Sequence, residues 1–161
     1  MLPRRDAVSD QIEVPHDGRP IYVLHLRVRH YETDALGHVN NAVYLNYLEQ
    51  AAIEHAAAMG FGQARLAELG GFFVVRRHEI DYLGGAVAGD DLAITTWPET
   101  LSGPRAVRCY EIRNAASAKR IVAARTLWVW IDRLTGRPRP MPRAILVAYA
   151  VKAGTPDQQD P

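Results

Sequence analysis

The segment Asp34-Ala35-Leu36-Gly37-His38 carries two side chains that could take part in acid–base chemistry. A carboxylate such as that of Asp34 can act as a general base or as a nucleophile. Histidine titrates near neutral pH, so His38 could assist it. Asn41, seven residues after Asp34, stands where we expect a helix to begin. The free N–H groups at a helix start can stabilise a developing oxyanion.

The same residues also have structural interpretations. An aspartate before a helix is commonly a turn or cap residue. Asn40 and Asn41 stand nearer to the helix start and can cap it, which leaves Asp34 free and favours catalysis. His38 could either orient a substrate and tune Asp34 or simply brace the loop, and both interpretations stay open. Asn41, like Asn40, has helix capping as its structural interpretation.

Two other kinds of chemistry are weakly indicated. His30, Asp34 and His38 are spaced four residues apart, which on a helix would form a metal-binding face. However, Gly37 and the preceding strand argue against a helix here. Cys109, the only cysteine, falls within a predicted strand, so we interpret it as a small buried apolar residue. A single cysteine allows no intramolecular disulfide and favours a cytoplasmic protein.

A strand and a long helix must position the Asp34 segment. Residues 21–31 alternate between apolar and polar side chains, which is typical of a half-buried strand. Residues 43–59 form a predicted helix that ends at Gly60. Its apolar side chains recur at three- and four-residue steps: Tyr44, Tyr47, Leu48, Ala51, Ala52, His55 and Met59. A helix that is apolar over most of its girth is usually wrapped by other structure.

Four more strands follow a predicted short helix at residues 63–69. They span residues 72–83, 92–101, 105–114 and 120–133. Short connections between them indicate antiparallel pairing. The pattern predicts an α+β fold in which a curved antiparallel sheet of about five strands covers one long helix. On the opposite sheet face we expect Arg77, Glu79 and Arg113 with Trp128 and Trp130, partly buried in a homo-oligomer.

Composition sets the broad class. The chain has 161 residues, of which 48% are hydrophobic and 23% charged, as expected for one soluble domain. A net charge of +1 gives no general attraction for nucleic acid or membranes. The sequence has neither a signal peptide nor an apolar run of the ~20 residues that span a bilayer, so we expect a cytoplasmic location. Residues 1–18 and 153–161 are polar and aperiodic, which predicts flexible tails around a domain at residues 19–152.

The segment at residues 34–41, Asp-x-x-Gly-His-Val-Asn-Asn, resembles the hotdog thioesterases of the 4-hydroxybenzoyl-CoA thioesterase superfamily. The resemblance covers roughly residues 20–150 and includes Ile80-Asp81-Tyr82-Leu83, Gly89-Asp90-Asp91-Leu92 and Thr135-Gly136-Arg137-Pro138. It implies a hotdog fold in which two protomers pair their sheets edge to edge, with two active sites at the dimer interface. Tetramers are also common in the family. Neither a metal nor an organic cofactor is implied.

The resemblance further implies hydrolysis of an acyl thioester. Asp34 would act on the thioester carbonyl carbon, as a nucleophile or by activating water, while the Asn41 N–H binds the carbonyl oxygen. We expect the acyl pocket to involve residues such as Tyr47, Met59, Phe72 and Phe73. The phosphates of coenzyme A require basic side chains, for which the candidates are Arg76, Arg77, Arg105 and Arg108.

Several alternatives stay open within the resemblance. Some hotdog thioesterases use a helix glutamate, here Glu49, but the presence of Asp34 favours a solvated or interface role for it. Only Arg105 is basic in Ser102-Gly103-Pro104-Arg105, where the archetypal enzyme has a basic cluster. An acyl carrier protein could therefore replace coenzyme A. A hotdog hydratase or dehydratase and a non-catalytic acyl-binding protein are the competing functions, and the motifs of the former are absent.

Overall fold

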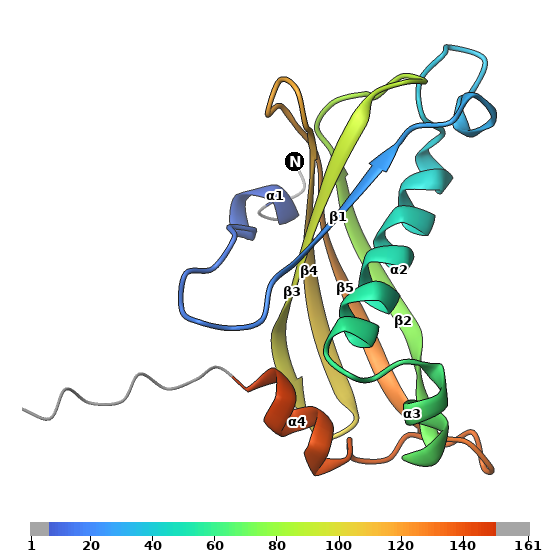
Figure 1. Ribbon diagram of the computed structural model, residues 1–161, viewed down its shortest axis with the longest axis vertical. Coiled ribbons are helices and arrows are strands. Elements are labelled where there is room, and N and C mark those ends of the chain that lie inside the picture. Colours follow the sequence, from blue (N-terminus) through green and yellow to red (C-terminus); the bar gives the residue numbers. More distant parts are fainter. Residues whose placement is uncertain (1–6, 151–161) are drawn as a thin grey trace, which may run out of the picture.

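In the computed structural model, which describes residues 7–150, a five-stranded antiparallel sheet curls around one long helix (Figure 1). The strands follow the spatial order β1-β3-β4-β5-β2, so β1 and β2 form the two edges. This arrangement confirms the predicted fold. The strand bounds are β1 Tyr22–Arg27, β2 Gly71–Tyr82, β3 Asp91–Ser102, β4 Arg105–Asn114 and β5 Arg120–Asp132.

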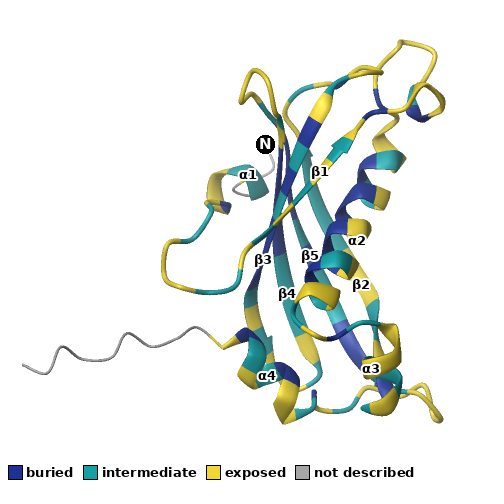
Figure 2. Ribbon diagram, in the orientation of Figure 1, coloured by how far each residue is buried: buried dark blue, intermediate teal, exposed yellow. Residues whose placement is uncertain are grey.

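The central helix α2 spans Asn41–Ala58 and begins two residues before the predicted start. The Asn40 side chain accepts a hydrogen bond of 2.9 Å from the Ala42 N–H, as expected of an N-cap. The buried stripe of α2 faces the sheet, as Figure 2 shows. It contains six predicted core residues: Tyr44, Tyr47, Leu48, Ala51, Ala52 and His55. No helix in residues 7–150 is long and apolar enough to cross a membrane.

The first strand is shorter than predicted because the chain turns to bury a carboxylate. β1 ends at Arg27, and His30–Glu32 form the 3-10 helix η1. The Glu32 side chain is 7% exposed and accepts hydrogen bonds from the Arg29 N–H at 2.7 Å and the Tyr47 hydroxyl at 2.8 Å. Burial alone would raise the pKa of Glu32, but these hydrogen bonds and the Arg29 guanidinium lower it. Glu32 is therefore ionised at neutral pH.

The prediction that Trp128 and Trp130 lie on the outer sheet face is wrong. Trp130 is fully buried in a cluster at the far end of α2, and Phe73 packs against it with ring centroids 5.1 Å apart. Trp128 packs against the core beneath α2. Helix α4, Arg143–Tyr149, was not predicted and supplies Ile145 and Tyr149 to the cluster. The Trp130 indole faces inward because this helix and the short α3, Gln63–Glu68, provide apolar partners there.

The outer face of the sheet is covered partly by residues that we expected to be a loose tail. Helix α1, Val8–Gln11, leads into Ile12, which is 1% exposed and packs with Trp97 and Cys109. The Arg120 guanidinium donates a 2.7 Å hydrogen bond to the Ile12 carbonyl. Burial raises the pKa of Cys109 to about 11, as expected for an unreactive core thiol. The remaining parts of the two predicted tails, residues 1–6 and 153–161, lie outside the described residues.

Candidate active site

Asp34 organises a tight turn in front of α2. One carboxylate oxygen, Oδ1, accepts hydrogen bonds from the Leu36 N–H at 2.8 Å and the His38 N–H at 3.3 Å. The backbone closes the same turn, since the Asp34 N–H donates to the His38 carbonyl at 2.8 Å. Gly37 adopts φ +76°, which favours glycine. Within residues 7–150, Oδ2 accepts no hydrogen bond, so Asp34 is a turn residue that still has an exposed, unpaired carboxylate oxygen.

Both ends of this loop are anchored to the buried Glu32 and to α2. The Asn40 N–H donates to the Glu32 carbonyl at 2.9 Å, and the Val43 N–H donates to the Asn40 carbonyl at the same distance. The N–H of Asn41, the first helical residue, has no hydrogen-bond partner in the described part of the chain. The carbonyl of the same residue is fixed as well, because the Tyr82 hydroxyl donates to the Asn41 carbonyl at 3.0 Å. The Asn41 N–H is thus held at the helix start with its donor free.

His38 packs against the neighbouring loop. A Cβ added to Gly85 would lie 3.1 Å from the His38 ring, and the His38 backbone forms a β-bridge with Val87. These contacts favour the loop-bracing interpretation of His38 over an assisting one. Within residues 7–150, no group of three or more His, Cys, Asp or Glu side chains is arranged to hold a metal ion.

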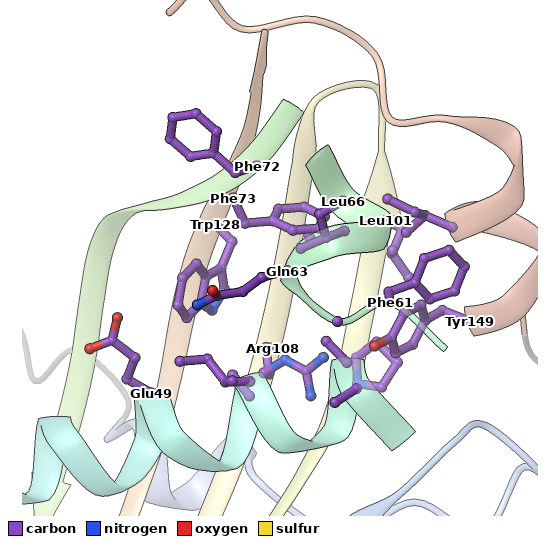
Figure 3. Close-up of a pocket in the computed structure, with 18 of the residues that line it drawn as sticks. Glu49, Phe61, Gln63, Leu66, Phe72, Phe73, Leu101, Arg108, Trp128 and Tyr149 are labelled. Carbon is purple, nitrogen blue, oxygen red and sulfur yellow. The ribbon is translucent and has the colours of Figure 1, made fainter. Parts of the chain in front are cut away.

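A cavity of about 380 Å³ opens beside the second half of α2 (Figure 3). Its walls are mostly apolar, and they come from α2, α3, α4 and the sheet. Phe72 and Phe73 line it, as expected of the acyl pocket, whereas Met59 is not among its lining residues. The cavity residue Ala56 lies about 22 Å along the helix axis from Asn41, at 1.5 Å per residue. The cavity's inner end is therefore remote from Asp34 in the same protomer.

The three predicted substrate-binding residues are not brought together. Tyr47 is 4% exposed in the core, where it holds Glu32 rather than lining the cavity. Arg76 is exposed at a β-bulge of the edge strand β2. Arg105 lines a groove on the outer sheet face with Arg77 and Arg125.

Arg108, one of the candidates for the coenzyme A phosphates, lines the cavity instead and is hydrogen-bonded to His55, which the sequence placed in the core. The Arg108 guanidinium donates hydrogen bonds from Nη1 to His55 Nδ1 at 2.8 Å and to Thr96 Oγ1 at 3.2 Å. His55 is 2% exposed and stacks on Tyr22, with ring centroids 5.6 Å apart. Burial, and secondarily the charge of Arg108, lower the pKa of His55 to about 4. Its regular spacing made His55 look like an ordinary core residue, and only the fold reveals its partner on β4.

A long helix wrapped by a curled antiparallel sheet, with a carboxylate turn at the helix start, defines a hotdog protein. This chain belongs to the thioesterase-like superfamily, whose family model matches residues 28–149. It is 32% identical over 124 residues to the acyl-CoA thioester hydrolase YbgC of Escherichia coli O6:H1, covering 77% of this chain and 92% of YbgC.

Two further similarities extend this relation. The chloroplastic acyl-acyl carrier protein thioesterase ATL3 of Arabidopsis thaliana is 30% identical over 123 residues, covering 74% of this chain and 63% of ATL3. The crystal structure of a probable thioesterase from Bartonella henselae superposes with a TM-score of 0.70 at 30% identity. That match covers 76% of this chain and all of the Bartonella chain, 100%.

The lowered pKa of His55 predicts acid-sensitive stability. Between pH 6.5 and 4 the unfolded chain binds a proton at this residue while the folded chain does not, so the free energy of unfolding falls as the pH falls. The loss is about 3 kcal/mol over this window. Urea denaturation at a series of pH values measures it. In His55→Gln the glutamine oxygen can still accept from Arg108, and this part of the pH dependence should disappear. Identical pH profiles for the two proteins would contradict the prediction.

Proposed function

We propose that this protein is a thioester hydrolase that cleaves an acyl thioester into a carboxylic acid and a thiol, with Asp34 and the Asn41 N–H as its reacting and stabilising groups. The observation that carries the proposal is the Asp34 turn. Within the described residues, it leaves one carboxylate oxygen without a hydrogen-bond partner, in the loop that leads into a helix whose first N–H also lacks one. Membership of the thioesterase-like superfamily supports it.

The two groups divide the work of hydrolysis. Asp34 removes a proton from a water molecule as that water attacks the carbonyl carbon, or attacks that carbon itself and is released by water afterwards. The carbonyl oxygen gains negative charge and accepts the Asn41 N–H, where the α2 dipole adds favourable potential. The carbon–sulfur bond then breaks, and the thiolate leaves with the bonding electrons. His38 keeps the loop in place rather than exchanging protons.

The site is completed by a second copy of the chain. The edge strand β2 exposes apolar side chains, with Phe72 43% and Tyr82 42% exposed. Antiparallel pairing of two β2 strands about their midpoints brings the Phe72 end of one close to the Tyr82 end of the other. The Tyr82 hydroxyl is hydrogen-bonded to the Asn41 carbonyl, and Phe72 lines the cavity. In such a dimer the cavity of one protomer opens toward the Asp34 turn of its partner.

The carrier of the acyl group is coenzyme A or an acyl carrier protein. YbgC is named for the former substrate class and ATL3 for the latter. The exposed guanidinium groups of Arg76 and Arg105 are our candidates for holding the phosphates of either carrier. A cytoplasmic location is part of the same proposal.

Asp34→Asn should lower kcat for acyl-CoA hydrolysis by about 10²- to 10⁴-fold, the usual contribution of a general base. The asparagine oxygen can still accept from the Leu36 and His38 N–H groups, so the turn and the melting temperature should be preserved. Release of free thiol measures the rate, and thermal unfolding is the control. Full activity in this variant would remove Asp34 from the reaction. A wild-type chain that binds acyl-CoA without releasing thiol would instead favour the non-catalytic alternative.

Asn41→Pro tests the backbone donor separately. Proline lacks an N–H but is well tolerated at the first position of a helix, and Asn40 already has the extended backbone, φ −59° and ψ 137°, that precedes proline. We expect kcat to fall by about 10²- to 10³-fold. The matched control, Asn41→Ala, keeps the N–H and should retain most of the activity. Equal activity in the two variants would exclude the Asn41 N–H as the oxyanion donor.

A mixed-dimer experiment tests the shared site. Ala56→Phe fills the cavity, and Asp34→Asn removes the base, so each variant alone should be nearly inactive. Random reassociation in equal amounts makes half of the dimers mixed. Each mixed dimer then combines one intact cavity with one intact Asp34 from the partner, and roughly a quarter of wild-type activity should return. No recovery, despite exchange of subunits seen by native mass spectrometry, would place both groups of a site in one protomer.

A further inference from the structure

Among the described residues that line the apolar cavity, Arg108 alone carries a positive charge. Arg108 enters it from β4, and Figure 3 shows its guanidinium directed toward Phe61 and Tyr149, away from the Glu49 end. The Arg108 guanidinium carbon lies 5.9 Å from the centroid of the Tyr149 ring. Apart from Glu49 and Gln63, the other side chains on the cavity wall are apolar or aromatic. A guanidinium group at this end of the cavity would not strengthen the binding of an uncharged hydrocarbon chain.

The charge of Arg108 has no counter-ion within the described part of the chain. Both hydrogen bonds of Nη1 go to neutral acceptors, His55 and Thr96. No carboxylate of residues 7–150 lies within 4.0 Å of its guanidinium nitrogens. Glu54, the acidic neighbour of His55 in sequence, instead accepts from Tyr22 at 3.0 Å and Gln50 at 2.8 Å. A partly buried cation without an anion is costly, and a bound carboxylate would offset that cost.

The remaining donors of Arg108 are available to such a ligand. Nη2 and Nε make no hydrogen bond of 3.5 Å or less to residues 7–150, although the guanidinium is close enough to the Tyr149 hydroxyl to influence it, and neither nitrogen is among the fully buried atoms that lack a partner. Two adjacent guanidinium N–H groups can bind a carboxylate in a bidentate manner. His55 stays neutral beneath Arg108, so a second positive charge does not compete for the ligand.

We propose that this cavity selects acyl groups whose far end carries a carboxylate, so that the preferred substrate is the monothioester of a dicarboxylic acid bound by Arg108. This inference rests on the proposed hydrolase function and names its substrate class. The cavity extends about 10 Å along α2 between Glu49 and Ala56, at 1.5 Å per residue, which suits a medium-length chain. The apolar walls hold the methylene groups, and the guanidinium holds the terminal carboxylate.

The test compares two CoA thioesters of equal chain length, suberyl-CoA and octanoyl-CoA. For the wild-type enzyme we expect a higher kcat/KM with suberyl-CoA. Arg108→Met keeps the length and apolar stem of the side chain but removes its charge. It should lower kcat/KM for suberyl-CoA by about ten- to a hundredfold, as expected for one charge-assisted hydrogen-bonded pair. Its kcat/KM for octanoyl-CoA should fall by a much smaller factor, so that the ratio of the two kcat/KM values drops. Arg108→Lys keeps the charge and should retain part of the preference.

A binding measurement separates failure of this inference from failure of the hydrolase proposal. Calorimetry with free suberate and free octanoate needs no turnover. Suberate should bind wild-type protein more tightly than octanoate, and Arg108→Met should abolish the difference. Retention of that difference in the variant, or equal loss of activity on both thioesters, would overturn the role of Arg108. A preference for octanoate in both assays would identify the cavity as a plain hydrocarbon pocket. If Arg108→Met unfolds, the same comparisons are made with Arg108→Lys, which must then show a weakened preference for the dicarboxylate.

Discussion

The buried carboxylate of Glu32 is the contact on which the candidate active site depends. Its side chain fixes Arg29 and Tyr47, and its carbonyl accepts from the Asn40 N–H. The loop that carries Asp34 is therefore tied at one end to the core of α2 and at the other to the cap of the same helix. A charge buried this deeply is stable only because hydrogen bonds satisfy it, so its geometry is narrowly defined. That constraint gives an otherwise exposed loop the order that positioning a base requires.

The two halves of the central helix α2 contribute to different features of the protein. At its start, a capped first turn presents the Asn41 N–H, which has no hydrogen-bond partner in residues 7–150, directly after the loop that carries Asp34. Along its second half, Ala52, Ala56 and Ala57 leave room for a cavity instead of packing tightly against the sheet. Small side chains at these positions reduce the buried apolar area of the helix, and the aromatic cluster around Trp130 provides compensating contacts at the same end. One helix can therefore serve both as a core element and as the wall of a binding site.

Much of the fold could be predicted because it depends on local pattern. The spacing of the apolar residues in α2 and the alternation in the strands predicted the type and order of the elements. The short turns between the strands predicted their antiparallel pairing. The orientation of Trp128 and Trp130 could not be predicted, since β5 is apolar on both faces and its alternation does not say which face meets a helix. Helix α4 is only seven residues long and owes its stability to contacts with Phe61 and Trp130.

In the candidate site, too, the features that are local in sequence could be predicted and the long-range pairings could not. The Asp34 turn and the helix start are adjacent in sequence, so the motif identified them together. Glu32 and Tyr47 are fifteen residues apart, and Arg108 lies 53 residues from His55, so their pairing depends on how the sheet wraps the helix. Tyr47 was predicted to bind the substrate because its contact with Glu32 could not be seen in the sequence. An aromatic residue on the core-facing side of a helix can either line a pocket or brace a loop. Only the position of Glu32 distinguishes these two roles.

The length of α2 explains why a second protomer belongs in the proposed enzyme. A thioester carbonyl held at the Asn41 N–H is about 12 Å along the axis from Glu49, and the cavity continues beyond that point toward Arg108. An acyl group reaching inward from Asn41 of the same chain would have to cross the well-packed first half of the helix, where Tyr44 and Leu48 are fully buried. The proposed antiparallel pairing of the β2 edges would remove this obstacle, because it would place the beginning of one helix next to the second half of the other. In that dimer the Asp34 turn and the cavity would meet, although they lie at opposite ends of the helix within one chain.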